Sequence, residues 1–193
     1  MTAGPRARLI AATIGTVQEH GVHAAGLSEL LKRGNASRNS LYQHFPAGKT
    51  ELVETAARIV SRLVYSHVSA MADALVKAPT VEGWLDELFG FWREALETSD
   101  YRAGSFMMAA ALDELNPPVQ SAAGQAFAEW TARLADGLVA AGIERATACA
   151  LAGLLLSVIE GAIVQSRALK SAHPFDDARN QLTILLAQHL PPR

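Results

Sequence analysis

A short segment near the amino terminus gathers five polar side chains within barely two helical turns: Arg38, Asn39, Tyr42, Gln43 and His44. Arginine can donate two parallel hydrogen bonds to guanine, and asparagine can bond adenine through its amide. Hydroxyl and basic groups suit phosphate oxygens. Residues of these types at this spacing predict a surface that binds nucleic acid.

The neighbouring residues predict how this surface is held. Gly34-Asn35 tolerates positive φ and can end a preceding helix, expected over Leu27 to Arg33. Ser37 is a preferred N-cap for the helix that follows. Leu41 and Phe45 lie four residues apart and are expected to face inward, which leaves the polar side chains on the other face. This pattern predicts a helix-turn-helix, whose second helix enters the major groove.

The segment Leu9 to Leu52 resembles the DNA-binding domain of the TetR family of bacterial transcriptional regulators. The matching residues are the opening helix LIAATIGTVQEHG, the turn and recognition helix SRNSLYQHF, and a lysine at the start of the next helix in FPAGKTEL. The extra residue in FPAGK is similar to the LmrA/YxaF-like subgroup. The resemblance implies a helix-turn-helix domain over residues 1–50 and a helical ligand-binding and dimerisation domain over residues 51–193.

Composition agrees with an all-α protein. Half of the 193 residues are apolar, few are aromatic, and alanine and leucine dominate. Charge is uneven, with six Lys/Arg against two Asp/Glu in residues 1–50, and eleven against seventeen in the remainder. A basic amino-terminal segment (residues 1–50) followed by an acidic remainder favours polyanion binding by the amino-terminal segment alone.

Apolar spacing predicts the order of helices along the chain. The first runs from about Arg6 to His20, where Gly21 stops it, and the fourth is long and buried on more than one side. From the fourth onward the expected ranges are Lys49–Lys77, Val81–Leu96, Arg102–Leu115, Pro118–Ala141, Arg145–Lys170 and Phe175–Leu190.

The resemblance implies roles for the recognition helix and its flanks. Arg38 and Asn39 are expected to approach bases, and phosphates to be held by Ser37, Tyr42, His44 and Lys49. Many members carry a small residue at the position of Asn39, so this side chain either reads a base or only crowds the groove. The plainer alternative is a polar, solvated helix that is unconnected with DNA.

Apolar side chains of the body are candidates for the walls of a ligand pocket, since such pockets form between helices. They are Trp84, Leu88, Trp92, Phe106, Met107, Phe127 and Trp130. Aromatic residues at helical spacing are more often plain core, and that reading stays open.

In the resembled family the last two helices pair with those of a second copy. The dimer interface is therefore expected at Ser157, Gly161, Leu182 and Leu186. The alternative is that these helices pack only within their own chain.

Other chemistries are not expected. His20 and His23 have no further ligand at metal spacing, so we expect neither metal nor cofactor and no enzymatic activity. Asp113-Glu114 is expected on a solvated helix face. The lone Cys149 agrees with a reducing cytoplasm and is expected in the core. The apolar run Ala146 to Ile159 is shorter than a membrane span needs.

These expectations combine into a functional hypothesis. The chain is expected to be a homodimeric, cytoplasmic transcription factor that binds a palindromic double-stranded operator and no membrane. It is expected to act as a repressor that a small apolar or aromatic effector releases from the operator. The alternative is a DNA-binding regulator whose second domain (residues 51–193) is filled by its own side chains and takes no effector, so that a protein partner or its abundance controls it.

Overall fold

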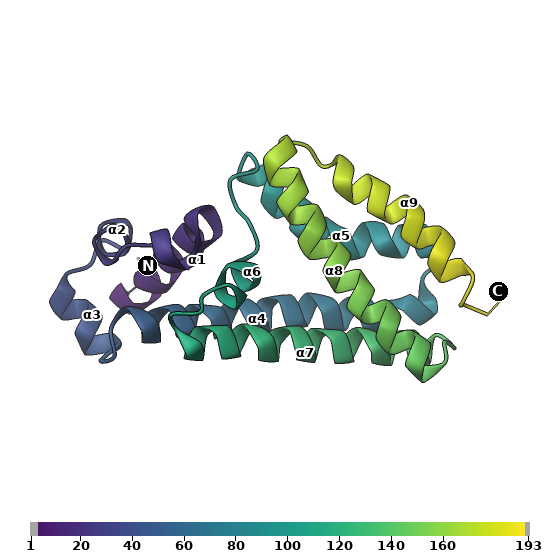
Figure 1. Cartoon of the computed structure of the whole chain (residues 1–193), viewed down its shortest axis with the longest axis horizontal. Helices are drawn as coiled ribbons and strands as arrows, with labels where there is room; N and C mark the ends of the chain where they lie inside the picture. The colour runs from purple at the N-terminus through teal and green to yellow at the C-terminus, as the bar shows by residue number, and fades with distance from the viewer. Residues whose placement is uncertain (1–3, 192–193) are drawn as a thin grey trace. The chain divides into compact units, whose positions relative to one another are not determined.

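The computed structural model describes residues 4–191, and within this range every regular element is helical (Figure 1). The prediction of an all-α fold is confirmed. In chain order the elements are α1 (Pro5–Ala24), α2 (Leu27–Arg33), α3 (Arg38–His44), α4 (Lys49–Ala74), the short 3-10 helix η1 (Leu75–Lys77), α5 (Val81–Thr98), α6 (Phe106–Ala111), α7 (Pro117–Ala140), α8 (Arg145–Leu169) and α9 (His173–Ala187).

The chain forms two compact units, each built from two stretches of sequence. The first comprises Met1–Arg62 and Gly104–Ala126, and the second comprises Leu63–Ala103 and Phe127–Arg193. This division differs from a boundary at residue 50, because the first half of α4 and the segment that contains α6 belong to the first unit. Both α4 and α7 contribute residues to both units.

In the first unit, α1 packs on α2, α3 and α6. Its apolar positions recur at helical spacing, and Leu9 and Val17 are buried. The two short helices each contribute a fully buried leucine, Leu30 from α2 and Leu41 from α3. Truncating a buried leucine to alanine typically costs about 2–5 kcal/mol. Apolar packing therefore holds α3 in the unit.

The predicted end of the first helix is seen as a kink. Gly21 has a φ of 82° and a ψ of 169°, which is not a helical conformation. Glycine reaches this region without the steric cost that a Cβ brings. The chain then makes one more turn that buries Val22 and ends at Ala24.

In the second unit, α5, α8 and α9 pack on one another. The buried face of α8 carries Leu155, Ile159 and Ile163. Phe89 of α5 meets Phe175 of α9 edge to face, with 5.6 Å between the ring centroids. Both phenylalanines are fully buried, so apolar contact is the main attachment of α9 to the unit.

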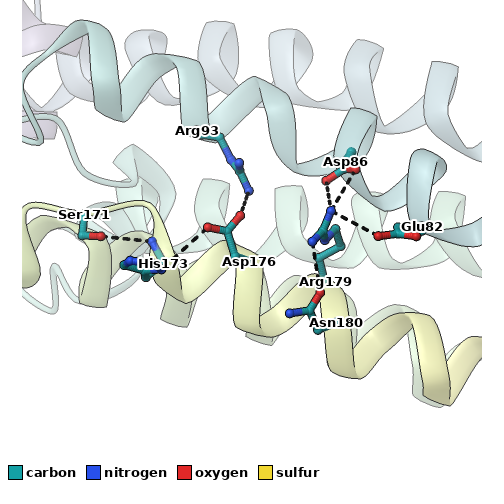
Figure 2. A network of polar contacts seen from close by, with 8 residues as sticks. All are labelled: Glu82, Asp86, Arg93, Ser171, His173, Asp176, Arg179 and Asn180. Atoms are coloured by element: carbon teal, nitrogen blue, oxygen red, sulfur yellow. Dashed lines mark hydrogen bonds and ion pairs between the residues drawn. The ribbon is translucent and has the colours of Figure 1, made fainter.

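Charged side chains add a second link between α5 and α9, shown in Figure 2. Arg93 donates to Asp176 at 2.7 Å. Further along α9, Arg179 lies between two carboxylates of α5, with its Nη1 3.3 Å from Glu82 and 3.3 Å from Asp86. These side chains are partly exposed, and such ion pairs each contribute about 0–1 kcal/mol.

The helix predicted over residues 102–115 is much shorter in the structure. α6 covers only Phe106–Ala111, and its N-cap is Ser105, whose hydroxyl accepts from the amide of Met108. Before it, Asp100 and Tyr101 have φ of 52° and 55°, which breaks the helical path. Two consecutive left-handed residues without glycine leave no signal in the sequence.

Two expectations about α8 need correction. Cys149 is exposed rather than in the core, because it falls on the outer side of the helix. The helix is also longer than the apolar run that ends at Ile159, and by length and composition alone it could cross a membrane. A buried face that packs on α5 and α9 accounts equally well for its apolar composition.

Candidate nucleic-acid interface

A tight turn joins α2 to α3. Asn35 takes the left-handed conformation there with a φ of 43°, whereas Gly34 has an ordinary φ of −78°. Gly34 is needed for space instead, because an added Cβ would lie 3.0 Å from the carbonyl oxygen of Leu30 and 3.3 Å from the Cα of Leu9. The predicted turn is present, with only one of its two residues at positive φ.

α3 is capped and oriented as its residue types predict. The hydroxyl of Ser37 accepts a hydrogen bond from the amide of Ser40 at 3.1 Å. Leu41 and Phe45 are buried against the rest of the unit. Arg38, Asn39, Tyr42, Gln43 and His44 are all exposed. The structure therefore leaves all five predicted polar side chains accessible on a helix that two buried side chains hold in place.

Tyr42 packs over the turn that follows α3. Gly48 has a φ of 73°, and an added Cβ would lie 3.3 Å from the Tyr42 ring. Nevertheless half of Tyr42 is exposed. The glycine of the FPAGK sequence thus lets the backbone turn beneath the ring into α4.

Lys49, at the start of α4, is partly buried. Its Nζ donates to the carbonyl oxygen of Val22 at 2.9 Å, which ties the last turn of α1 to α4. Burial lowers the pKa of Lys49, and the negative charge of Asp113 acts in the opposite direction. One of the three ammonium donors is therefore engaged within the protein before any phosphate contact.

Asp113 is not on a solvated face, as the sequence suggested, but is 1% exposed. Both carboxylate oxygens accept from the side-chain amide of Asn116, at 3.1 and 2.9 Å. The same Asn116 accepts from the hydroxyl of Thr50 in α4 at 2.9 Å. His23 lies nearby, with its Nε2 3.6 Å from Asp113. The network links the α6–α7 loop to α1 and α4 within the first unit.

The basic residues of the unit differ in what they contact. Arg33 is paired with Glu19 at 2.9 Å and with Glu29 at 2.8 Å. Arg38 is exposed, and among residues 4–191 no ion pair engages it. Arg38 therefore brings a positive charge that no carboxylate in the described part of the chain pairs with to the exposed side of α3, which favours contact with an anionic groove.

The pocket candidates from the sequence fall in both units. Phe106 and Met107 lie in α6, which packs on α1 in the first unit, while the others belong to the second. Trp84, Leu88 and Trp130 are almost fully buried, and the indole of Trp84 donates to the carbonyl oxygen of Met71 at 2.7 Å. The remaining two are Trp92, which is 9% exposed, and the half-buried Phe127.

The dimer candidates are also divided. Leu182 and Leu186 are 4% and 0% exposed within their own chain, so they have almost no surface left for a partner. Ser157 is exposed and Gly161 is half-exposed, and both lie on the outer side of α8. An added Cβ at Gly161 would meet nothing within 4 Å.

A capped helix that follows a tight turn, with one face packed and the other polar and exposed, defines a helix-turn-helix DNA-binding module. Family comparison agrees with this class. Residues 9–56 match the bacterial regulatory proteins of the tetR family, and residues 83–181 match the C-terminal domain of LmrA/YxaF-like transcriptional regulators. The chain belongs to the TetR family, and the predicted resemblance is confirmed.

Individual relatives cover nearly the whole chain. The uncharacterised HTH-type transcriptional regulator Rv0196 of Mycobacterium tuberculosis is 32% identical over 98% of each chain. LmrA of Bacillus subtilis is 24% identical, covering 88% of this chain and 89% of its own. A TetR regulator from Legionella pneumophila has the same fold, with a TM-score of 0.81, 16% identity and coverage of 98% and 99%. The chain is thus a DNA-binding transcriptional regulator and not an enzyme.

Proposed function

We propose that the chain is a cytoplasmic homodimeric repressor that binds a palindromic operator through α3 and is released by a small apolar or aromatic effector. The observation that carries the DNA-binding part is the exposed polar face of α3, held by buried Leu41 and Phe45. Arg38 and Asn39 stand in its first turn, where helix-turn-helix proteins contact base edges.

The proposed DNA contacts fall into two groups, contacts with base edges and contacts with phosphates. Arg38 and Asn39 approach bases, because their side chains can form paired hydrogen bonds with guanine and adenine. Phosphates are held by the side chains at the edges of α3 and at the start of α4, namely Ser37, Tyr42, His44 and Lys49. Lys49 keeps donors for this purpose beside the one that it gives to Val22.

The proposed dimer surface is the outer side of α8. Gly153, Ser157, Gly161 and Val164 recur at spacings of four and three, and each is exposed or half-exposed. Leu154 and Val164 are 42% and 48% exposed, which is apolar surface that a partner helix can cover. Small residues on this side permit a close approach, as in helical bundles. Two recognition helices in one assembly suit two operator half-sites.

A matched pair of substitutions tests the dimer. Gly161→Glu introduces a charge into the proposed interface, and Gly124→Glu introduces one on α7. At both positions an added Cβ meets nothing within 4 Å of its own chain, so the two changes begin from the same open space. Sedimentation should give about twice the 20.5 kDa chain mass for the parent and for Gly124→Glu, and the single mass for Gly161→Glu. A parent protein that is monomeric at tens of micromolar contradicts the proposal.

Support for an effector comes from the course of α4 and from a cluster of aromatic rings in the second unit. α4 begins at Lys49 in the first unit and ends at Ala74 in the second. His67 on α4 stacks on Phe91, with 4.9 Å between ring centroids, and meets Trp92 edge to face. A ligand that displaces these rings acts on α4, and in a dimer it changes the separation of the two α3 helices.

Thermal-shift screening of hydrophobic and aromatic compounds identifies a binder, because a ligand that prefers the folded state raises the melting temperature. Any hit is then titrated against the free protein and against the protein bound to DNA. An inducer must lower DNA affinity by the same factor by which DNA lowers its own affinity. A hit that binds equally well with and without DNA is not the inducer.

A second candidate is a regulator with a filled body that takes no effector. The burial of Trp84 favours it, since the indole already has its hydrogen-bond partner in Met71. In that case no compound shifts the melting temperature, and operator occupancy follows protein concentration alone.

A further inference from the structure

Arg8, in the first turn of α1, reaches the turn that joins α2 to α3. Its Nε donates to the carbonyl oxygen of Gly34 at 3.1 Å, and its Nη2 donates to that of Asn35 at 3.0 Å. The two acceptors belong to consecutive residues, and Arg8 is half-buried. A planar guanidinium presents its donors in a rigid fork, which suits a pair of neighbouring carbonyls.

The turn draws its other hydrogen bonds from α2. The amides of Gly34, Asn35 and Ala36 donate to carbonyl oxygens in the last turn of that helix. These bonds satisfy the donors of the turn, and Arg8 satisfies two of its acceptors. A cation is also favoured here, because the carboxyl end of α2 carries the negative end of the helix dipole. Arg8 thus completes the hydrogen bonding of the turn from another helix.

The residue next to Arg8 holds the same turn by packing. Leu9 is fully buried, and its Cα lies 3.3 Å from where a Cβ on Gly34 would stand. Ser37, the N-cap of α3, follows Asn35 by only two residues. The direction in which α3 leaves the turn therefore depends on contacts made by the first turns of α1.

We infer that Arg8 is a positioning residue for DNA recognition: by holding the carbonyls of Gly34 and Asn35, it sets the register of α3 on the bases. The inference rests on the proposed reading of bases by Arg38 and Asn39. Base hydrogen bonds need a donor–acceptor distance of about 2.7–3.2 Å and weaken steeply once the angle at the hydrogen falls below about 120°, so a small reorientation of α3 affects them first. Binding to the DNA backbone depends mainly on charge and tolerates such a movement.

The test compares two substitutions of the same kind. Arg8→Lys keeps the charge but loses the fork. Arg33→Lys is the matched control, because Arg33 directly precedes the turn and pairs with Glu19 and Glu29 rather than with turn carbonyls. Dissociation constants are measured for a duplex that the parent protein selects from a randomised library and for a mixed-sequence duplex. Both are followed over a range of salt, at a temperature where circular dichroism shows each protein folded.

Arg8→Lys should reduce the preference for the selected duplex by about tenfold or more, the range expected when a bidentate base contact is lost. Its affinity for the mixed-sequence duplex and its salt slope should stay at parent values, and Arg33→Lys should keep the parent preference. An unchanged preference in Arg8→Lys overturns the inference. A third variant, Arg8→Gln, removes the charge as well as the fork. The inference is also overturned if this variant weakens both duplexes equally with a salt slope lower by about 0.9, which assigns a phosphate contact instead. A parent protein that prefers no duplex contradicts the proposed function itself, and the inference with it.

Discussion

A close approach of two helices in the second unit leads to a quantitative prediction. Gly137 of α7 lies against Ala72 of α4, and an added Cβ would stand 2.7 Å from the carbonyl oxygen of Ala72 and 2.8 Å from its Cα. Both are backbone atoms, so no side chain can rotate out of the way. Arg133, one turn earlier on α7, holds the same pair of helices by donating to Ser69 and to Asp73.

Gly137→Ala therefore has two opposing effects. Alanine stabilises a helix interior by about 0.5–1 kcal/mol relative to glycine. Overpacking of this kind costs about 1–3 kcal/mol. Gly124→Ala, on the same helix, brings only the first effect, since its Cβ meets nothing within 4 Å. The difference between the two variants isolates the close approach, and we expect Gly137→Ala to be the less stable by about 1–3 kcal/mol.

Thermal unfolding followed by circular dichroism measures this difference. For a chain of this length 1 kcal/mol corresponds to about 2–4 °C in melting temperature. Gly124→Ala should melt at or slightly above the parent temperature, and Gly137→Ala below it. If both alanines raised the melting temperature equally, the helices would not approach as closely as described.

Three further predictions concern single side chains. The carboxylate of Glu144 accepts hydrogen bonds from the amides at the start of α8, and these bonds lower its pKa. The stability that the carboxylate contributes is therefore present above the unfolded pKa of about 4.5 and is lost as the pH falls through the folded pKa. Glu144→Gln should accordingly melt below the parent at pH 7, and the gap should close in acid. Lys49→Met should weaken binding to every DNA sequence by the same factor and reduce the salt slope by about 0.9. A lower melting temperature with an unchanged salt slope would instead show that Lys49 only holds the fold, through its bond with Val22. Asn35→Ala should cost about 1–2 kcal/mol at a φ of 43°, and Asn35→Gly should cost less, by chemical denaturation.

The existence and orientation of α3 could be predicted from the sequence, because the residues that determine them lie close together in the chain. The cap at Ser37 and the spacing of Leu41 and Phe45 depend on residues a few positions apart. The turn at Asn35 was signalled by the residue type alone. Such features are decided within one or two helical turns, and the structure reproduces them.

The contacts that hold α3 in place could not be predicted, because they are made by residues far apart in the sequence. Arg8 bonds carbonyls 26 and 27 positions away, and backbone carbonyls carry no sequence signal. Asp113 looked like a solvated acid, because its partners in α1 and α4 come together only in the folded unit. The placement of Phe106 with α1 likewise follows from a tertiary contact that apolar spacing does not encode.

The reading of DNA bases by α3 is tested most directly by selection from a randomised duplex library. The parent protein should enrich two related half-sites, with centres about 10–10.5 base pairs or a multiple of that apart. Arg38→Ala and Asn39→Ala should each relax the preference at particular positions within a half-site, by about 1–3 kcal/mol. If both variants instead lost affinity uniformly across the library, α3 would not be the element that reads the operator.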